Sequence, residues 1–201
     1  PGALLDTAQQ SYDDSKRLIE QWHGHGRSLY AITPRFAPTS TEAQLNAAMA
    51  LRQEYPDVYV QSHLAEMLDE IAWVKQLFPN QLDYVDVYDR YGLLGDRSIY
   101  GHGVHLSERE LGRLYETSTA IAHCPTSNIV LNSGPFNLGN VKLAERPVRL
   151  GLGTDIGAGP NFSMLCAMKD AYITAQISGG SLHPIQAFYL ATQGGAQALH
   201  V

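Results

Sequence analysis

The sequence predicts an α/β fold in which a parallel sheet forms part of a TIM-type (β/α)₈ barrel. Short β-rich runs that end in polar, Gly or Pro residues alternate with longer segments of helical spacing, as in successive βα units. The chain has 201 residues, whereas a complete barrel needs about 250. No low-complexity tract or linker interrupts the pattern. We therefore expect residues 1–201 to form one domain, the C-terminal part of a barrel.

Five runs have the composition of β-strands and end at polar or turn-forming residues. They are residues 28–33, 58–63, 98–102, 120–124 and 148–155. Parallel strands in a barrel all end at the same rim, where the active sites of such proteins are built. The residues at these five strand ends are therefore the first candidates for function.

Helices are predicted between and after the strands from capping residues and apolar spacing. Thr39 with Glu42 has capping-box spacing, and Ser107 with Glu110 repeats it. The remaining predicted helices cover about 66–78, 83–91, 162–177, 184–190 and 193–199. Gly92 is expected to end the helix over 83–91.

Composition excludes several classes of function. A net charge of −6 and 14 scattered Lys and Arg residues argue against a nucleic-acid surface, which needs clustered basic residues. Cys124 and Cys166 stand in unrelated contexts, so we expect neither a disulfide framework nor a cysteine-rich zinc site. The sequence has no apolar run of 18 residues and no leader pattern, so we expect a cytoplasmic protein without a membrane span.

Ionisable or aromatic side chains stand at the end of every predicted strand. These residues are Arg35 and Phe36, His63 and Glu66, His102, His123, and Asp155. Imidazole and carboxylate groups bind divalent metals and move protons, and Arg beside Phe suits a planar ring that forms hydrogen bonds. The pattern predicts a metal-dependent catalytic site for a small molecule.

Several of these residues also have structural explanations, which the sequence leaves open, and Arg35 also fits a surface charge. His63 and Glu66 form His-x-x-Glu, in which a metal ligand stands beside a carboxylate that accepts a proton from metal-bound water. His63 also fits a buried structural histidine, and Glu66 a first-turn carboxylate favoured by the helix dipole. Asp155 fits either an oxygen ligand or a turn cap.

The other histidines differ in how well they fit the rim. We favour His102 over His105 because it lies nearer the strand end. We expect the proline at 125 to force an extended exit that aims His123 at the rim, and a purely structural role fits His123 equally well. His23 and His25 have a His-x-His spacing but precede a strand, so we do not expect them to bind metal. Two further histidines, His183 and His200, are expected to be structural or solvated.

Five segments resemble the guanine deaminases of the amidohydrolase superfamily, in the same order along the chain. They are Pro-Arg-Phe-Ala-Pro-Thr-Ser (34–40), Gln-Ser-His-Leu-Ala-Glu (61–66), Gly-His-Gly-Val-His-Leu (101–106), His-Cys-Pro-Thr-Ser-Asn (123–128) and Gly-Leu-Gly-Thr-Asp (151–155). The last two are typical of the whole superfamily, whereas the first two point to guanine deaminases. The resemblance implies roughly strands 4 to 8 of the barrel.

The resemblance implies a metal site and a reaction. His63 on the fifth barrel strand and Asp155 on the eighth would bind Zn²⁺, with Fe²⁺ as the alternative. Glu66 would be the general acid and base, and Asp155 would also take part in catalysis. Zinc-bound hydroxide would attack the amino-bearing carbon of guanine, and the products would be xanthine and ammonia.

The resemblance also implies how the purine is held. Arg35 and Phe36 would bind guanine, and His102 on the sixth strand would orient or polarise the attacked ring. We expect His123 to contribute to substrate binding from the same rim. The rival interpretations are another amidohydrolase-type deaminase or a chlorohydrolase that acts on adenosine-like or triazine rings, and a non-catalytic remnant that binds a purine or a partner.

One feature of the family is missing from this sequence. The resemblance calls for a His-x-His pair at the end of the first barrel strand, and no strand end here carries one. The chain starts at Pro1 without a Met, in what reads as a helix, so we expect an N-terminal truncation that removes the first strands and a small β-sandwich. We therefore expect the isolated chain to bind zinc weakly or not at all and to be inactive. Its open sheet edges favour association with a second copy, as a homodimer, or with a partner half.

Overall fold

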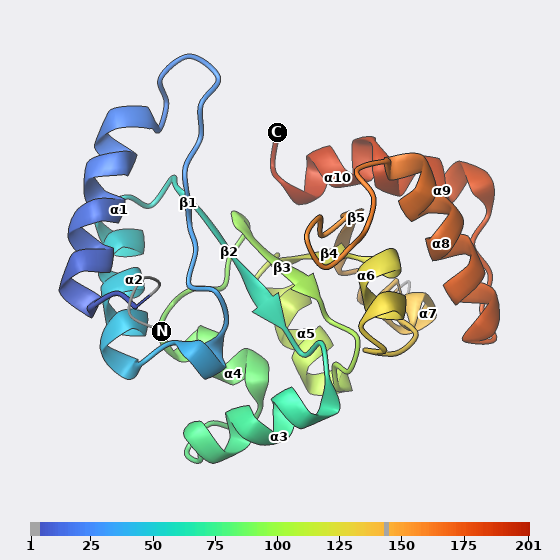
Figure 1. The fold of residues 1–201 in the computed structure, drawn as a ribbon, viewed down its shortest axis with the longest axis horizontal. Helices are drawn as coiled ribbons and strands as arrows, with labels where there is room; N and C mark the ends of the chain where they lie inside the picture. The colour runs from blue at the N-terminus through green and yellow to red at the C-terminus, as the bar shows by residue number, and fades with distance from the viewer. Residues whose placement is uncertain (1–4, 143–144) are drawn as a thin grey trace.

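The computed structural model describes residues 5–142 and 145–201, and these residues contain one five-stranded parallel sheet. The strands lie side by side in chain order (Figure 1). They are β1 (Ala31–Ile32), β2 (Tyr59–Leu64), β3 (Ser98–His102), β4 (Ala120–His123) and β5 (Arg149–Leu152). The predicted parallel α/β sheet is confirmed.

Helices cover the sheet and continue past its last strand. In Figure 1, α1 and α2 lie beside β1 at one end of the sheet, and α8 to α10 lie beside β5 at the other. The helices are α1 (Ala8–Trp22), α2 (Glu42–Glu54), α3 (Leu68–Leu77), α4 (Tyr84–Arg90), α5 (Glu108–Glu116), α6 (Pro125–Val130), α7 (Leu138–Val141), α8 (Met164–Ile177), α9 (Pro184–Ala191) and α10 (Gln193–Ala198). None of the helices within the described ranges combines the length and the hydropathy that a bilayer crossing requires.

The predicted helix starts are right in one case and wrong in another. Ser107 and Glu110 form the expected capping box of α5. The predicted box at Thr39 and Glu42 is wrong, because a 3₁₀ turn (Ala37–Thr39) precedes α2. Thr41 caps α2 instead, and its box partner is Gln44. The predicted helix around Pro1 lies outside the described residues, and the first described helix begins at Ala8.

Three strands are shorter than predicted: β4 ends one residue early, at His123, and turns occupy the ends of β1 and β5. Ser28 belongs to the preceding turn, where its carbonyl accepts a hydrogen bond from the Gly24 amide, so β1 contains only Ala31–Ile32. β5 ends at Leu152, and Asp155 has a φ of 48°, which removes it from the strand. In both cases backbone conformation, rather than side-chain composition, sets the strand boundary.

Two short helices, α6 and α7, were not predicted. The backbone of Cys124 is not helical, but Pro125 is the first residue of α6, so the chain does not continue in an extended conformation. Proline suits the first helical position because its missing N–H has no partner there in any case. The extended exit expected before Pro125 is therefore limited to Cys124, and α6 follows at once.

The core between the sheet and helices α3 to α5 rests on three buried tyrosines. Tyr88 lies between Tyr84 and Tyr100, with ring centres 5.6 and 4.7 Å away respectively. All three rings are almost fully buried. Burial raises the pKa of Tyr88 to about 12, so its hydroxyl stays neutral and donates one hydrogen bond.

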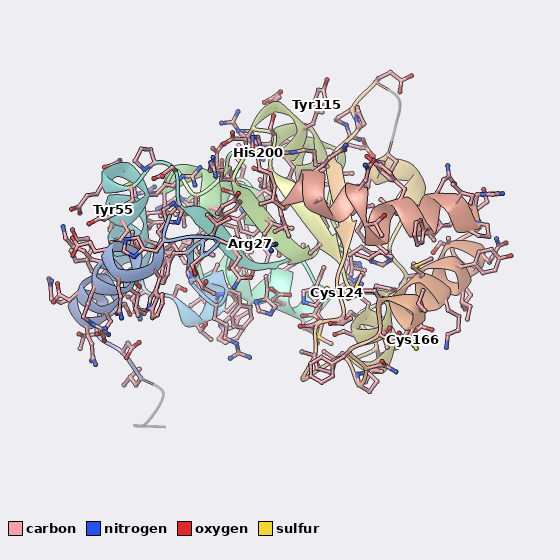
Figure 2. All side chains as sticks on the ribbon, turned by 90° about the horizontal axis from the view of Figure 1, so that it is seen from above. Arg27, Tyr55, Tyr115, Cys124, Cys166 and His200 are labelled. Atoms are coloured by element: carbon pink, nitrogen blue, oxygen red, sulfur yellow. The ribbon has the colours of Figure 1, made fainter. Side chains whose placement is uncertain are left out.

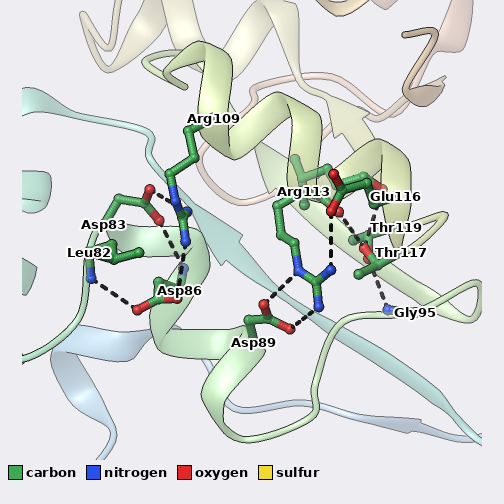
Figure 3. Close-up of polar contacts among 11 residues, drawn as sticks. Leu82, Asp83, Asp86, Asp89, Gly95, Arg109, Arg113, Glu116, Thr117 and Thr119 are labelled. Atoms are coloured by element: carbon green, nitrogen blue, oxygen red, sulfur yellow. Dashed lines mark hydrogen bonds and ion pairs between the residues drawn. The ribbon is translucent and has the colours of Figure 1, made fainter.

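Ion pairs attach α4 to α5 on the outside of this core. Figure 3 shows Arg109 between Asp83 and Asp86, and Arg113 in a two-pronged contact with Asp89. Such partly exposed pairs each contribute about 0–1 kcal/mol. They fix the position of α4, whose Tyr88 reaches the end of β2.

The cysteines lie apart in the structure, as Figure 2 shows. Both are free thiols: Cys124 is buried beyond the end of β4, and Cys166 lies on α8 and is partly exposed. Burial raises the pKa of Cys124 to about 12 and keeps its thiol protonated. The sequence-based expectation of no disulfide framework agrees with these positions.

Candidate functional site

Three side chains from different strand ends meet at one point of the rim. One potential ligand atom from each of His63, His102 and Asp155 lies within 4.8 Å of the other two. His63 lies near the end of β2, His102 ends β3, and Asp155 follows β5. Residues 92 positions apart in the sequence thus come within reach of one ion.

The backbone at these strand ends adopts a conformation that is rare for residues other than glycine. Ala65, His102 and Asp155 have φ values of 46°, 73° and 48°. Such left-handed residues each cost about 1–3 kcal/mol when the surroundings hold them there, and they cluster at functional sites. Here they turn the chain sharply where β2, β3 and β5 end.

His63 offers one free ring nitrogen. Its Nδ1 lies 2.6 Å from the carbonyl oxygen of Arg35, and its backbone amide donates to the same oxygen. Because a carbonyl only accepts, Nδ1 carries the hydrogen and Nε2 keeps its lone pair. The hydroxyl of Tyr88 donates to the His63 carbonyl at 2.9 Å and accepts from the Ala37 amide at 3.0 Å, which anchors this strand end.

His102 is buried, with 1% of its surface exposed, and it is stacked on His63 with ring centres 5.4 Å apart. Its Nδ1 lies 2.9 Å from Oδ1 of Asn128. With that oxygen as acceptor, Nε2 carries a lone pair that faces Oε2 of Glu66 at 3.5 Å and Oδ2 of Asp155 at 3.9 Å. A lone pair and two carboxylates that converge in this way fit a cation or a shared proton.

Hydroxyl groups hold the two carboxylates. Ser127 donates to Oδ2 of Asp155 at 2.7 Å, and Ser133 donates to Oε1 of Glu66 at 3.0 Å. Sequence reasoning missed these partners and Asn128. Ser127 and Asn128 belong to the segment 123–128 that resembles the superfamily, and that resemblance could have pointed to them. Nothing in the sequence pattern singles out Ser133.

The remaining predicted site residues lie around this cluster. The Arg35 guanidinium is exposed and lies 5.1 Å from the centre of the Phe36 ring, and that ring meets His63 edge-on at 6.1 Å. His123 is buried and stacked on Phe136 at 4.2 Å. Its Nδ1 has no hydrogen-bond partner within the described part of the chain.

The buried His123 predicts loss of stability in acid. Burial lowers its pKa to about 3, with a smaller contribution from His102. The unfolded chain binds a proton near pH 6.5 and the folded chain does not, so stability falls as the pH drops from about 6.5 towards 3. Between pH 7 and pH 5, this group should remove about 2 kcal/mol from the free energy of unfolding.

Urea unfolding at both pH values measures this effect. His123→Phe preserves the stacking on Phe136 and removes the titrating group, so the variant should lose about 2 kcal/mol less than the unaltered chain. Equal losses in both proteins would show that His123 is not held neutral by burial.

His23 and His25, the pair with His-x-His spacing, are not part of this cluster. Nδ1 of His23 accepts a hydrogen bond from the Tyr30 amide, and its Nε2 lies 3.2 Å from Asp57. His25 is exposed in the turn that leads to β1. His183 caps α9 through its ring, which agrees with the structural role expected for it.

Known proteins match this chain over nearly its whole length. It is 54% identical to the guanine deaminase of Escherichia coli strain K12 over 199 residues, which are 99% of this chain and 45% of that protein. It is 47% identical to a probable guanine deaminase of Deinococcus radiodurans, covering 98% of this chain and 45% of that protein. The chain thus spans about half the length of the curated relatives it matches.

Solved structures match in the same way. E. coli guanine deaminase superposes with a TM-score of 0.97 over 100% of this chain and 46% of that one. A guanine deaminase from C. acetobutylicum with bound guanine, 33% identical, gives 0.88 over 99% and 49%. An adenosine deaminase from Xanthomonas campestris with bound zinc, 26% identical, gives 0.86 over 100% and 45%.

The five-stranded sheet therefore corresponds to part of the barrel of these larger structures, as the sequence predicts. The family model for the amidohydrolases matches residues 3–201. The chain belongs to the amidohydrolase family.

Proposed function

We propose that this chain forms the catalytic half of a guanine deaminase, which hydrolyses guanine to xanthine and ammonia. The observation that carries the proposal is the meeting of His63, His102 and Asp155 at one point, with the Glu66 carboxylate beside them. The C. acetobutylicum structure, which has guanine in its active site, supports the choice of substrate.

We infer that the site takes a divalent metal held by His63 and Asp155. An imidazole Nε2 with a free lone pair and a carboxylate oxygen are ligands that suit zinc, and Fe²⁺ accepts the same pair. The zinc in the X. campestris structure favours zinc. When bound, such an ion lowers the pKa of a water molecule and so supplies a hydroxide near neutral pH.

The protein's own groups then move protons and orient the ring. Oε2 of Glu66 faces the site while Oε1 is held by Ser133, so Oε2 is the atom that accepts and returns a proton. Oδ2 of Asp155 lies 3.9 Å from Nε2 of His102, so Asp155 would assist that transfer and His102 would orient the reacting ring. His102 is buried and held by Asn128, which favours an orienting role.

Arg35 and Phe36 form the proposed purine-binding pair. The guanidinium lies over the aromatic ring, where it presents several N–H donors beside a flat apolar surface. Nδ1 of His123 is buried without a partner among the described residues, and a substrate atom that reaches it would supply the missing hydrogen bond to this neutral imidazole. A purine offers both the flat face and the acceptor atoms that this set matches.

A change at Arg35 should affect substrate binding more than turnover. Arg35→Ala removes ring recognition and leaves the proton-transfer groups in place, so KM should rise by about 10-fold or more while kcat changes little. Steady-state kinetics with guanine measure both constants in a chimera in which residues 1–201 replace the matching segment of E. coli guanine deaminase. Thr33→Ala changes an exposed residue two positions earlier and is the matched control, for which KM should stay unchanged. A fall in kcat with constant KM for Arg35→Ala would contradict the assignment.

The proposed reaction is tested in a replacement chimera. In this protein, residues 1–201 replace the matching segment of E. coli guanine deaminase, to which they are 54% identical. We expect ammonia release from guanine and little from adenosine, cytosine or a chlorotriazine. Preference for adenosine or a triazine would assign the chain to a different deaminase or hydrolase, and inactivity on all four compounds would support a non-catalytic remnant.

The proposal also covers the cellular compartment and the oligomeric state. A cytoplasmic enzyme with a small-molecule purine substrate fits the acidic composition and the free thiols. Within the described ranges, β1 and β5 each have one side without a neighbouring strand. Such edges favour association, and we propose a homodimer.

A further inference from the structure

Glu66 is held by a serine that lies far away in the sequence. Oγ of Ser133 donates to Oε1 of Glu66 at 3.0 Å across 67 positions of the chain. Ser133 is buried, with 4% of its surface exposed, and it stands between α6 and α7. A buried hydroxyl that reaches a rim carboxylate is a specific contact, because either group would be costly to bury without a partner.

Ser133 is itself fixed from two sides. Its amide donates to the Asn128 carbonyl at 2.8 Å, and its carbonyl accepts from Nε2 of His105 at 2.7 Å. The amide of His105 in turn donates to the carbonyl of Ala65 at 3.1 Å. Since Ala65 precedes Glu66, the contacts close a ring that runs from the end of β2 through His105 and Ser133 back to Glu66.

This ring determines which carboxylate oxygen faces the site. With Oε1 occupied by the Ser133 hydroxyl, Oε2 is the oxygen that lies 3.5 Å from Nε2 of His102. A glutamate side chain without such a contact turns freely among several rotamers. Holding a proton-transfer group in one orientation preserves the short distances that catalysis requires.

We propose that Ser133 is a positioning residue, which His105 holds in place, and that it keeps Oε2 of Glu66 directed at the reacting atoms. This inference rests on the proposed deaminase function. Ser133→Ala should lower kcat by about 10- to 100-fold, with KM and bound metal unchanged. Ser133→Thr retains a hydroxyl and should restore most of the lost turnover.

Kinetics of the replacement chimera test the proposal, with Ser178→Ala as the matched control. The Ser178 hydroxyl donates to the Thr174 carbonyl at the end of α8, outside the cluster, so that variant should keep full activity. A Ser133→Ala protein with unchanged kcat would overturn the proposal. So would a fall in kcat that is accompanied by equal loss of metal, because Ser133 would then support the fold of the site in general.

Crystal structures of the 201-residue chain provide a test that does not depend on activity. In the Ser133→Ala chain, the Glu66 carboxylate should leave its position beside His102 or occupy several positions. A single, unchanged orientation would overturn the proposal even if turnover fell, and it also decides the case if Ser133→Thr fails to fold. If the unaltered chimera releases no ammonia from guanine, the proposed function fails, while these structures still test the positioning role of Ser133.

Discussion

Replacing Glu66 by glutamine should leave the metal in place and remove turnover almost completely. Glutamine has nearly the same size and still accepts from Ser133, but it cannot take up and return a proton. General acid–base groups contribute about 10²- to 10⁴-fold to enzymatic rates, so kcat for guanine should fall by that factor. Ammonia release and metal content of the replacement chimera measure both parts of the prediction.

The matched control for Glu66→Gln is Glu70→Gln. Glu70 also follows β2, but its carboxylate accepts from the amides of Glu66 and Met67 and from the Tyr84 hydroxyl. We expect the free energy of unfolding of that variant to fall and its proton-transfer step to remain. An active Glu66→Gln protein would show that another group carries the proton.

Loss of His63 or Asp155 should remove metal binding itself. Replacing a residue that only supports a metal ligand already lowers the metal affinity by about 10- to 100-fold. Alanine at either direct ligand should therefore weaken zinc binding by at least about 100-fold, and guanine turnover should disappear with it. Both properties are measured in the replacement chimera. Competition with a chromophoric chelator gives its zinc affinity, and metal analysis gives the number of zinc ions bound per chain.

His25→Ala is the control for these two variants. It removes an exposed imidazole from the only His-x-His spacing in the sequence, which lies before β1. Its zinc affinity should equal that of the unaltered protein. If His25→Ala weakened zinc binding while His63→Ala did not, the metal site would lie at the opposite rim of the sheet, where the strands begin.

The sequence predicted those parts of the fold that depend on local pattern. Runs of strand-forming residues that end in polar or turn-forming residues located all five strands, and the limits of β3 were right at both ends. The start of α2 was displaced because Thr39 and Thr41 are both plausible caps, and only the preceding 3₁₀ turn distinguishes them. The helix at Pro125 was missed because proline fits an extended exit as well as a first helical turn.

The candidate site was predictable to the same extent. His63 and His102 stand at strand ends and Asp155 shortly after one, where the topology of a parallel sheet brings them together. The contacts that hold them depend on how the loops fold back over the rim. Ser133 reaches Glu66 across 67 residues, and Tyr88 reaches His63 across 25, distances at which sequence spacing carries no information about contact.

The most direct test of a shared metal site is anomalous X-ray scattering at the zinc edge from crystals of the zinc-loaded chimera. We expect a zinc peak about 2.0–2.2 Å from Nε2 of His63 and from a carboxylate oxygen of Asp155. Zinc bound elsewhere, with His63 and Asp155 both out of contact with it, would show that these two side chains do not form a shared metal site.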